Sequence, residues 1–133
     1  MIVIDSSVLV MALTNSGNAF DQVASFLDGS RPAAPHLIDL EAANAIKRLE
    51  RNGMLDPTTA EAMVRDASLM PIRRFDHRLL LGRCWQLRHN LSAYDASYVA
   101  LSELLDAPLI TADSALASAP GIRCEVHLLQ DST

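Results

Sequence analysis

Apolar residues follow two different spacings along this chain, and each spacing predicts a different kind of element. Short apolar runs, typical of buried strands, occur at 2–5, 33–34, 72–75, 107–113 and 123–129. Between these runs, apolar residues recur every three or four positions and predict helices at 7–13, 18–28, 37–51, 56–70, 78–88, 91–106 and 114–118. Strands that alternate with helices predict an α/β sandwich around a central, mostly parallel five-stranded sheet.

The composition indicates one folded domain. The chain has 133 residues, of which 50% are apolar and 20% are charged. This length suits a single domain with a substantial core, and no internal repeat or linker divides residues 1–133. No apolar run approaches the roughly 18 residues that cross a membrane, and the first residues lack the pattern of a signal peptide. We therefore expect a cytoplasmic protein.

Cysteines, histidines and large aromatic residues are interpreted here mainly as packing or surface residues. Cys84 and Cys124 lack the spacing of a zinc site or a redox pair, so we expect two buried, reduced thiols. Trp85 and Tyr94 could stack on nucleic-acid bases, but core packing is the interpretation that we favour. The histidines, which are scattered without the close spacing of a metal pair, are His36, His77, His89 and His127.

Four acidic residues occupy positions that are unusual for solvated side chains. Asp5 ends the first predicted strand and Asp113 ends the fourth. In open parallel sheets, ligands collect beyond the carboxyl ends of the strands. Glu41 and Asp95 lie in predicted helices with apolar residues three and four positions away, so each lies in or beside a buried face.

Taken singly, each acid could be a helix cap or a boundary residue with its carboxylate in water. Four such acids in one small domain would repel one another strongly unless a cation lay between them. Oxygen ligands without histidine or cysteine favour Mg²⁺ or Mn²⁺ over zinc. We therefore predict a divalent cation held by Asp5, Asp95 and Asp113, with Glu41 as a further catalytic acid.

This kind of cation suits phosphoryl chemistry. A metal-activated water that attacks a phosphodiester, while the metal stabilises the leaving oxygen, requires acidic ligands and no protein nucleophile. Ser7 fits as a hydroxyl that orients a ligand or a water molecule. Its alternative interpretation is an ordinary residue in the first turn of a helix.

The net charge of −5 does not exclude a nucleic acid as the phosphodiester substrate. Without the four proposed site residues, 12 of the 16 acids remain against 11 basic residues, so the rest of the chain is nearly neutral. Five of the basic residues are arginines between positions 71 and 90, where there is a single acid. We predict that Arg73, Arg74 and Arg78 contact the phosphates of the nucleic acid, the alternative being a solvated helix face.

Three segments of the chain resemble a known family. "VIDSSVLV", "DLEAANAIKR" and "AYDASYVALSELLDAPLITAD" closely resemble the PIN domain, in particular the small ribonuclease toxins of VapBC-type toxin–antitoxin pairs, and the resemblance covers essentially the whole chain. It implies an acidic quartet at Asp5, Glu41, Asp95 and Asp113, with a hydroxyl at Ser7. It also implies a five-stranded parallel sheet flanked by helices, Mg²⁺- or Mn²⁺-dependent endoribonuclease activity, a homodimer, and inhibition by a cognate antitoxin.

Other interpretations of the same acids remain open. A phosphatase of the haloacid-dehalogenase type needs a second aspartate two residues after the first, where this chain has Ser7. A phosphate-accepting signalling domain needs paired early acids and a later lysine after a strand, but Lys47 is the only lysine. A non-catalytic interaction module could bind a basic partner through the acids. Metal-dependent cleavage of RNA would separate these alternatives.

Overall fold

Five short strands form one sheet in the computed structural model of the chain, which describes residues 1–14, 21, 24–25 and 27–129. The strands are β1 (Ile2–Ile4), β2 (Pro32–Pro35), β3 (Arg73–Phe75), β4 (Leu109–Thr111) and β5 (Val126–Leu128). Their order in the sheet is β3-β2-β1-β4-β5, and every neighbouring pair is parallel. The predicted α/β fold with a five-stranded sheet is therefore confirmed, with a fully parallel sheet in the described residues.

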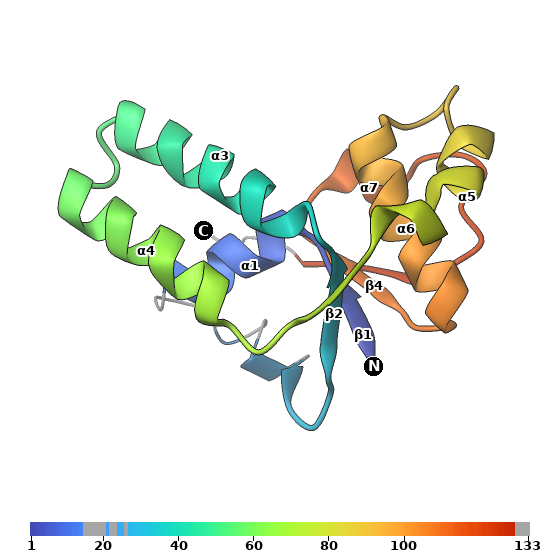
Figure 1. Ribbon diagram of the computed structural model, residues 1–133, viewed down its shortest axis with the longest axis horizontal. Helices are drawn as coiled ribbons and strands as arrows, with labels where there is room; N and C mark the ends of the chain where they lie inside the picture. Colours follow the sequence, from blue (N-terminus) through green and yellow to red (C-terminus); the bar gives the residue numbers. More distant parts are fainter. Residues whose placement is uncertain (15–20, 22–23, 26, 130–133) are drawn as a thin grey trace.

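Helices cover both faces of the sheet (Figure 1). They are α1 (Ser6–Thr14), α3 (Ile38–Arg51), α4 (Pro57–Leu69), α5 (Leu81–Gln86), α6 (Ala93–Leu105) and α7 (Ser114–Ala117). Helices α1, α3 and α4 pack together on one side, whereas α5, α6 and α7 lie on the other. The helix predicted at 18–28 falls largely on residues outside the described ranges.

The helix predicted at 78–88 is interrupted. A 3₁₀ turn, η1 (His77–Leu79), comes first, and α5 begins only at Leu81. The Asp76 carboxylate caps the turn by accepting a hydrogen bond from the Arg78 N–H at 2.8 Å. Leu80, at the junction of the two segments, lies in the core and is 1% exposed.

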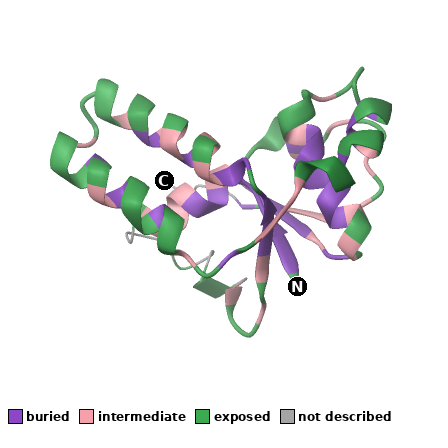
Figure 2. Ribbon diagram, viewed as in Figure 1, coloured by how far each residue is buried: buried purple, intermediate pink, exposed green. Residues whose placement is uncertain are grey.

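Helix α6 is the most deeply buried helix in the described chain, and it lies against β1 and β2 (Figure 2). Its seven residues from Ala96 to Ser102 are all buried. The helix begins at Ser92, whose hydroxyl accepts the Asp95 N–H at 3.1 Å. It ends at Asp106, which has a left-handed backbone (φ 50°). A helix fixed in this way is a rigid support for side chains in its first turn.

The main core lies between the sheet and its helices. Every residue of β1 and β4 is buried. Both cysteines are free, but only Cys84 is buried as predicted, since Cys124 is half-buried. None of the helices in the described chain combines the length and hydrophobicity needed to cross a membrane.

Candidate active site at the carboxyl edge of the sheet

The four predicted acids all lie where helices begin. Asp5 follows β1 and precedes α1, and Asp113 caps α7 by accepting a hydrogen bond from the Ala115 N–H at 2.9 Å. Glu41 and Asp95 lie in the first turns of α3 and α6. The partial positive charge at a helix N-terminus favours a carboxylate there. An acid at one of these positions can therefore cap a helix and also belong to a shared site.

Asp5 is the buried acid of this group, with only 5% of its surface exposed. Its Oδ1 accepts hydrogen bonds from the Ser7 hydroxyl at 2.5 Å and from the Val8 N–H at 3.2 Å. Its Oδ2 accepts a hydrogen bond from the Thr111 hydroxyl. Burial raises the pKa of Asp5, and these three hydrogen bonds oppose the rise. The carboxylate therefore has a fixed orientation.

Two hydroxyls connect Asp5 to the loop that carries Asp113. Ile4 is level with Ile110 in the sheet, so the end of β1 lies beside the end of β4. The Ser7 hydroxyl accepts the Ala112 N–H at 3.0 Å, and the Thr111 hydroxyl accepts the Asp113 N–H at 3.0 Å. Each hydroxyl thus accepts from the loop and donates to Asp5.

Thr111 is a residue that the prediction from sequence omits. It is fully buried and has the only polar side chain of β4. A lone polar residue inside an apolar strand, two positions before an acid that ends the strand, is the signal that could have identified it. The strand register that brings its hydroxyl to Asp5 is visible only in three dimensions.

Glu41 and Asp95 are both half-buried, and burial is the main cause that raises the pKa of each. The Tyr98 hydroxyl donates a hydrogen bond to Glu41 Oε1 at 2.5 Å. Burial, together with this bond, raises the pKa of Tyr98, so its phenol keeps its proton. Tyr98 is also missing from the prediction, although its position three residues after Asp95 places both on one helix face.

Like charges face one another across this edge. The Asp113 carboxylate raises the pKa of Asp5, and the Asp5 and Asp113 carboxylates raise that of Asp95. Asp95 and Asp5 in turn raise the pKa of Glu41. Among the described residues, no lysine or arginine forms a salt bridge with any of these four acids. The structure thus brings the predicted acids within electrostatic range without a cationic partner.

The chemistry of these side chains fits a hard divalent cation. All the donors are oxygens, which Mg²⁺ and Mn²⁺ prefer, and they include neither histidine nor cysteine. Within the described ranges, no three histidine, cysteine, aspartate or glutamate side chains already converge to enclose an ion. A cation at this edge would therefore be held by a few carboxylates and would keep several waters, as Mg²⁺ usually does.

Arg74, predicted to contact RNA, uses all five of its N–H donors inside the protein. Two bind the Asp39 carboxylate, at 2.6 and 2.8 Å. The others bind backbone carbonyl oxygens at 3.0 to 3.3 Å, those of Ala67, Met70 and Ile72. An RNA phosphate could reach this guanidinium only if one of these bonds broke.

Arg73 and Arg78 are exposed, unlike Arg74. Arg78 forms a salt bridge with Asp76 at 2.6 Å, and its hydrogen bonds lower the pKa of Asp76 to about 2. The Arg73 guanidinium lies 5.0 Å from the ring centroid of Phe75 and has no carboxylate partner in the described chain. A phosphate contact by Arg73 or Arg78 remains a prediction.

Trp85 and Tyr94 do not pack in the core, and the interpretation favoured from the sequence is wrong for both. They are 68% and 67% exposed. Trp85 is covered instead by the Arg88 guanidinium, 4.6 Å from its ring centroid. The sequence spacing placed them on helical segments but could not show which face of each helix is buried.

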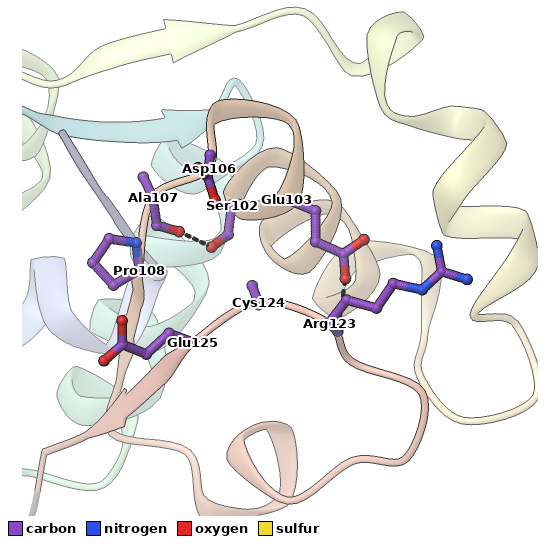
Figure 3. A pocket seen from close by; sticks show the side chains of 8 residues that line it. All are labelled: Ser102, Glu103, Asp106, Ala107, Pro108, Arg123, Cys124 and Glu125. Carbon is purple, nitrogen blue, oxygen red and sulfur yellow. Dashed lines mark hydrogen bonds between the residues drawn. The ribbon is translucent and has the colours of Figure 1, made fainter.

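A separate hollow of about 360 Å³ lies at the opposite edge of the sheet (Figure 3). It is lined by the end of α6 and by the loops that lead into β4 and β5: Ser102, Glu103, Asp106, Ala107, Pro108, Arg123, Cys124 and Glu125. The Glu103 carboxylate there accepts hydrogen bonds from the Arg83 side chain and from the Arg123 N–H. The hollow contains none of the four predicted acids.

Comparisons with known proteins agree with this architecture. The family model of the PIN domain matches residues 2–122. Ribonuclease VapC1 of Mycobacterium tuberculosis is 38% identical over 129 residues, which cover 96% of this chain and 97% of that protein. Among solved structures, PAE2754 from Pyrobaculum aerophilum has a TM-score of 0.68 at 22% identity, covering 94% and 81% of the two chains. A toxin–antitoxin complex from Klebsiella pneumoniae gives 0.62 at 16% identity, covering 92% and 93%. The chain therefore belongs to the PIN-domain family, in its VapC group.

Proposed function

We propose that this protein is a Mg²⁺- or Mn²⁺-dependent endoribonuclease, and that residues 1–133 form one nuclease domain that acts in the cytoplasm as the toxin of a toxin–antitoxin pair. One observation carries the proposal: four carboxylates without a cationic side-chain partner gather at the carboxyl edge of a parallel sheet. The PIN-domain match and a relative that is named a ribonuclease support the same activity.

In this proposal, Asp5, Asp95 and Asp113 hold the cation, and Ser7 orients Asp5. When bound, the cation supplies a water of lowered pKa and neutralises charge on the leaving oxygen. Without it, the same carboxylates would repel an RNA phosphate. The hydrogen bonds from Ser7 and Thr111 keep the Asp5 carboxylate in one orientation and so remove part of the cost of ordering the site.

Glu41 is the proposed acceptor for a proton of the attacking water. Its Oε1 is engaged by Tyr98, whereas its Oε2 has no hydrogen-bond partner among the described residues. Burial raises the pKa of Glu41 above its ordinary value, which makes the carboxylate a better base. Glu41 therefore acts beside the cation ligands.

The proposed partners are RNA, a cognate antitoxin and a second copy of the chain. Of the three predicted arginines, Arg73 and Arg78 are the two that an RNA backbone could reach, because both are exposed. Arg73 lies at the start of β3, at the edge of the sheet opposite the acids, whereas Arg78 follows the carboxyl end of that strand. A toxin–antitoxin complex among the solved structures of this fold supports a protein partner, and carboxylates without a cation suit a basic side chain from it. The homodimer rests on the family resemblance.

Incubation with total RNA tests the proposed activity. We expect new RNA ends with Mg²⁺, none with chelator, and a strong loss in Asp95→Asn. The matched control is Asp66→Asn, because Asp66 is an exposed acid on α4. Intact RNA at saturating Mg²⁺ or Mn²⁺ would refute the nuclease. A basic protein partner captured by the same inactive chain would then favour the interaction module.

A further inference from the structure

Tyr98 connects the two helical layers at the edge where the acids lie. It is 1% exposed and belongs to α6, three residues after Asp95. Its hydroxyl donates to Glu41 on α3, and α3 and α6 cover opposite faces of the sheet (Figure 1). A single 2.5 Å hydrogen bond thus joins a buried ring on one helix to an acid on the other.

This bond is the only hydrogen bond that the Glu41 carboxylate makes within the described ranges. The Glu41 side chain has three rotatable bonds, and repulsion from Asp5 and Asp95 would turn its carboxylate away from them. The Tyr98 ring is held by close packing, because it is 1% exposed and belongs to the main hydrophobic core. A fixed donor therefore opposes the repulsion and the rotational freedom of Glu41.

We propose that Tyr98 is a positioning residue for RNA cleavage, whose hydroxyl holds the Glu41 carboxylate beside Asp5 and Asp95. The inference rests on the proposed nuclease function and adds a residue that touches neither the cation nor the RNA. Groups that orient catalytic or ligand side chains through hydrogen bonds typically contribute 10- to 100-fold to activity or metal affinity. We expect an effect of about that size on the cleavage rate.

The ring and the hydroxyl of Tyr98 have separable roles. The ring fills the core, as any buried aromatic residue does, whereas the hydrogen bond depends on one oxygen atom. Tyr98→Phe removes that atom and keeps the ring. Tyr94→Phe is the matched control, because Tyr94 belongs to the same helix, is 67% exposed, and its hydroxyl has no hydrogen-bond partner in the described chain.

The experiment compares both variants with the wild type. In chelator it measures the melting temperature and the dissociation constant for RNA. With metal it measures the rise in melting temperature that Mn²⁺ causes and the cleavage rate at saturating RNA and Mg²⁺. For Tyr98→Phe we expect a cleavage rate lower by about 10- to 100-fold per folded molecule. RNA affinity and the Mn²⁺ response should stay within about twofold of the wild type, since the proposed cation ligands keep their contacts. Tyr94→Phe should match the wild type throughout.

A second background tests whether Tyr98 acts through Glu41. Adding Tyr98→Phe to Glu41→Ala should leave the residual cleavage rate within about twofold of Glu41→Ala alone, because the partner is already absent. This comparison also covers poor folding of Tyr98→Phe, since a folding defect would lower the rate in both backgrounds. Equal loss in both backgrounds, or Tyr98→Phe with wild-type cleavage, would overturn the inference. If the wild type and Tyr94→Phe do not cleave RNA, the nuclease proposal fails, and this inference fails with it.

Discussion

Among the residues that the structure describes, the buried and half-buried carboxylates fall into two groups with opposite surroundings. Glu103 accepts two hydrogen bonds from the Arg83 guanidinium, at 2.6 and 3.2 Å. Burial alone would raise the pKa of Glu103, but Arg83 and the Arg123 N–H bring it below its ordinary value. Asp5 and Asp95 have no such partner, and burial and neighbouring acids raise their pKa values.

The difference shows where the fold uses charge for stability and where it does not. A buried carboxylate normally requires a cationic partner or several hydrogen bonds, because its desolvation is unfavourable. The acids at the carboxyl edge keep hydrogen bonds but face one another, so the metal-free protein retains repulsion that a bound cation would relieve. The same kind of substitution should therefore have opposite effects on stability in the two groups.

The largest effect is expected for Asp5→Asn. It should lower Mg²⁺-dependent cleavage by more than about 100-fold, since changes to groups that merely support a ligand already cost 10- to 100-fold. It should also raise the metal-free melting temperature by a few degrees, roughly 1 kcal/mol at this chain length, because repulsion is relieved. The stabilisation that Mg²⁺ gives the wild type should shrink. Thermal melts with chelator and with Mg²⁺, beside an RNA cleavage assay, measure all three quantities.

Asparagine can keep the local contacts of Asp5. The amide oxygen can accept the hydrogen bonds from Ser7 and the Val8 N–H, and the Thr111 hydroxyl can rotate to accept from the amide nitrogen. Asparagine also caps a helix about as well as aspartate. Glu103→Gln is the control from the other group and should lower the melting temperature without abolishing cleavage, because it weakens the pair with Arg83. Full cleavage by Asp5→Asn at saturating Mg²⁺ would show that Asp5 serves only as a helix cap.

The next effect concerns the carboxylates that have an arginine partner, which include Asp39 as well as Glu103. Arg74→Gln should lower the free energy of unfolding by about 1–2 kcal/mol, since it removes five hydrogen bonds and leaves Asp39 unpaired, although both side chains keep some solvent contact. Arg73→Gln should cost much less, because Arg73 is exposed. Urea unfolding of the two variants measures the difference. Equal stability of both would show that the Arg74–Asp39 pair contributes little.

A smaller effect is expected from pH without metal. The folded-state pKa values of Asp5, Glu41 and Asp95 are raised, so the folded state binds more protons than the unfolded state just above the ordinary pKa of about 4. Stability should therefore rise as pH falls from 7 to about 5. Below about 4, groups with lowered pKa values, such as Asp76, should reverse the trend. Melting temperatures in chelator across this range test the sign, and Asp5→Asn should flatten the rise.

The sequence predicts the fold well because alternating strands and helices leave few topologies. It also predicts the four acids, because acids at strand ends and in apolar helix faces are visible in one dimension. Thr111 and Tyr98 could not be found in the same way, since their hydroxyls matter only through strand register and helix packing. Arg74 is predicted to contact RNA because the sequence reveals its charge. The sequence does not reveal that Asp39 and three carbonyl groups occupy its N–H donors.

The smallest expected effect tests the RNA contact by the two exposed arginines, Arg73 and Arg78. If Arg73 and Arg78 each neutralise a phosphate, Arg73→Gln and Arg78→Gln should each reduce the slope of log binding constant against log salt by about 0.7 on single-stranded RNA. Arg78 would first have to leave Asp76, so its loss in affinity should be the smaller one. Binding is measured in Asp5→Asn, without metal, so that RNA stays intact. Arg65→Gln on α4 is the control, since Arg65 is exposed and lies outside the arginine-rich segment. A slope that is the same in all three variants would assign Arg73 and Arg78 to a solvated face or a protein interface. The attraction for RNA phosphates at the site would then have to come from the bound cation alone.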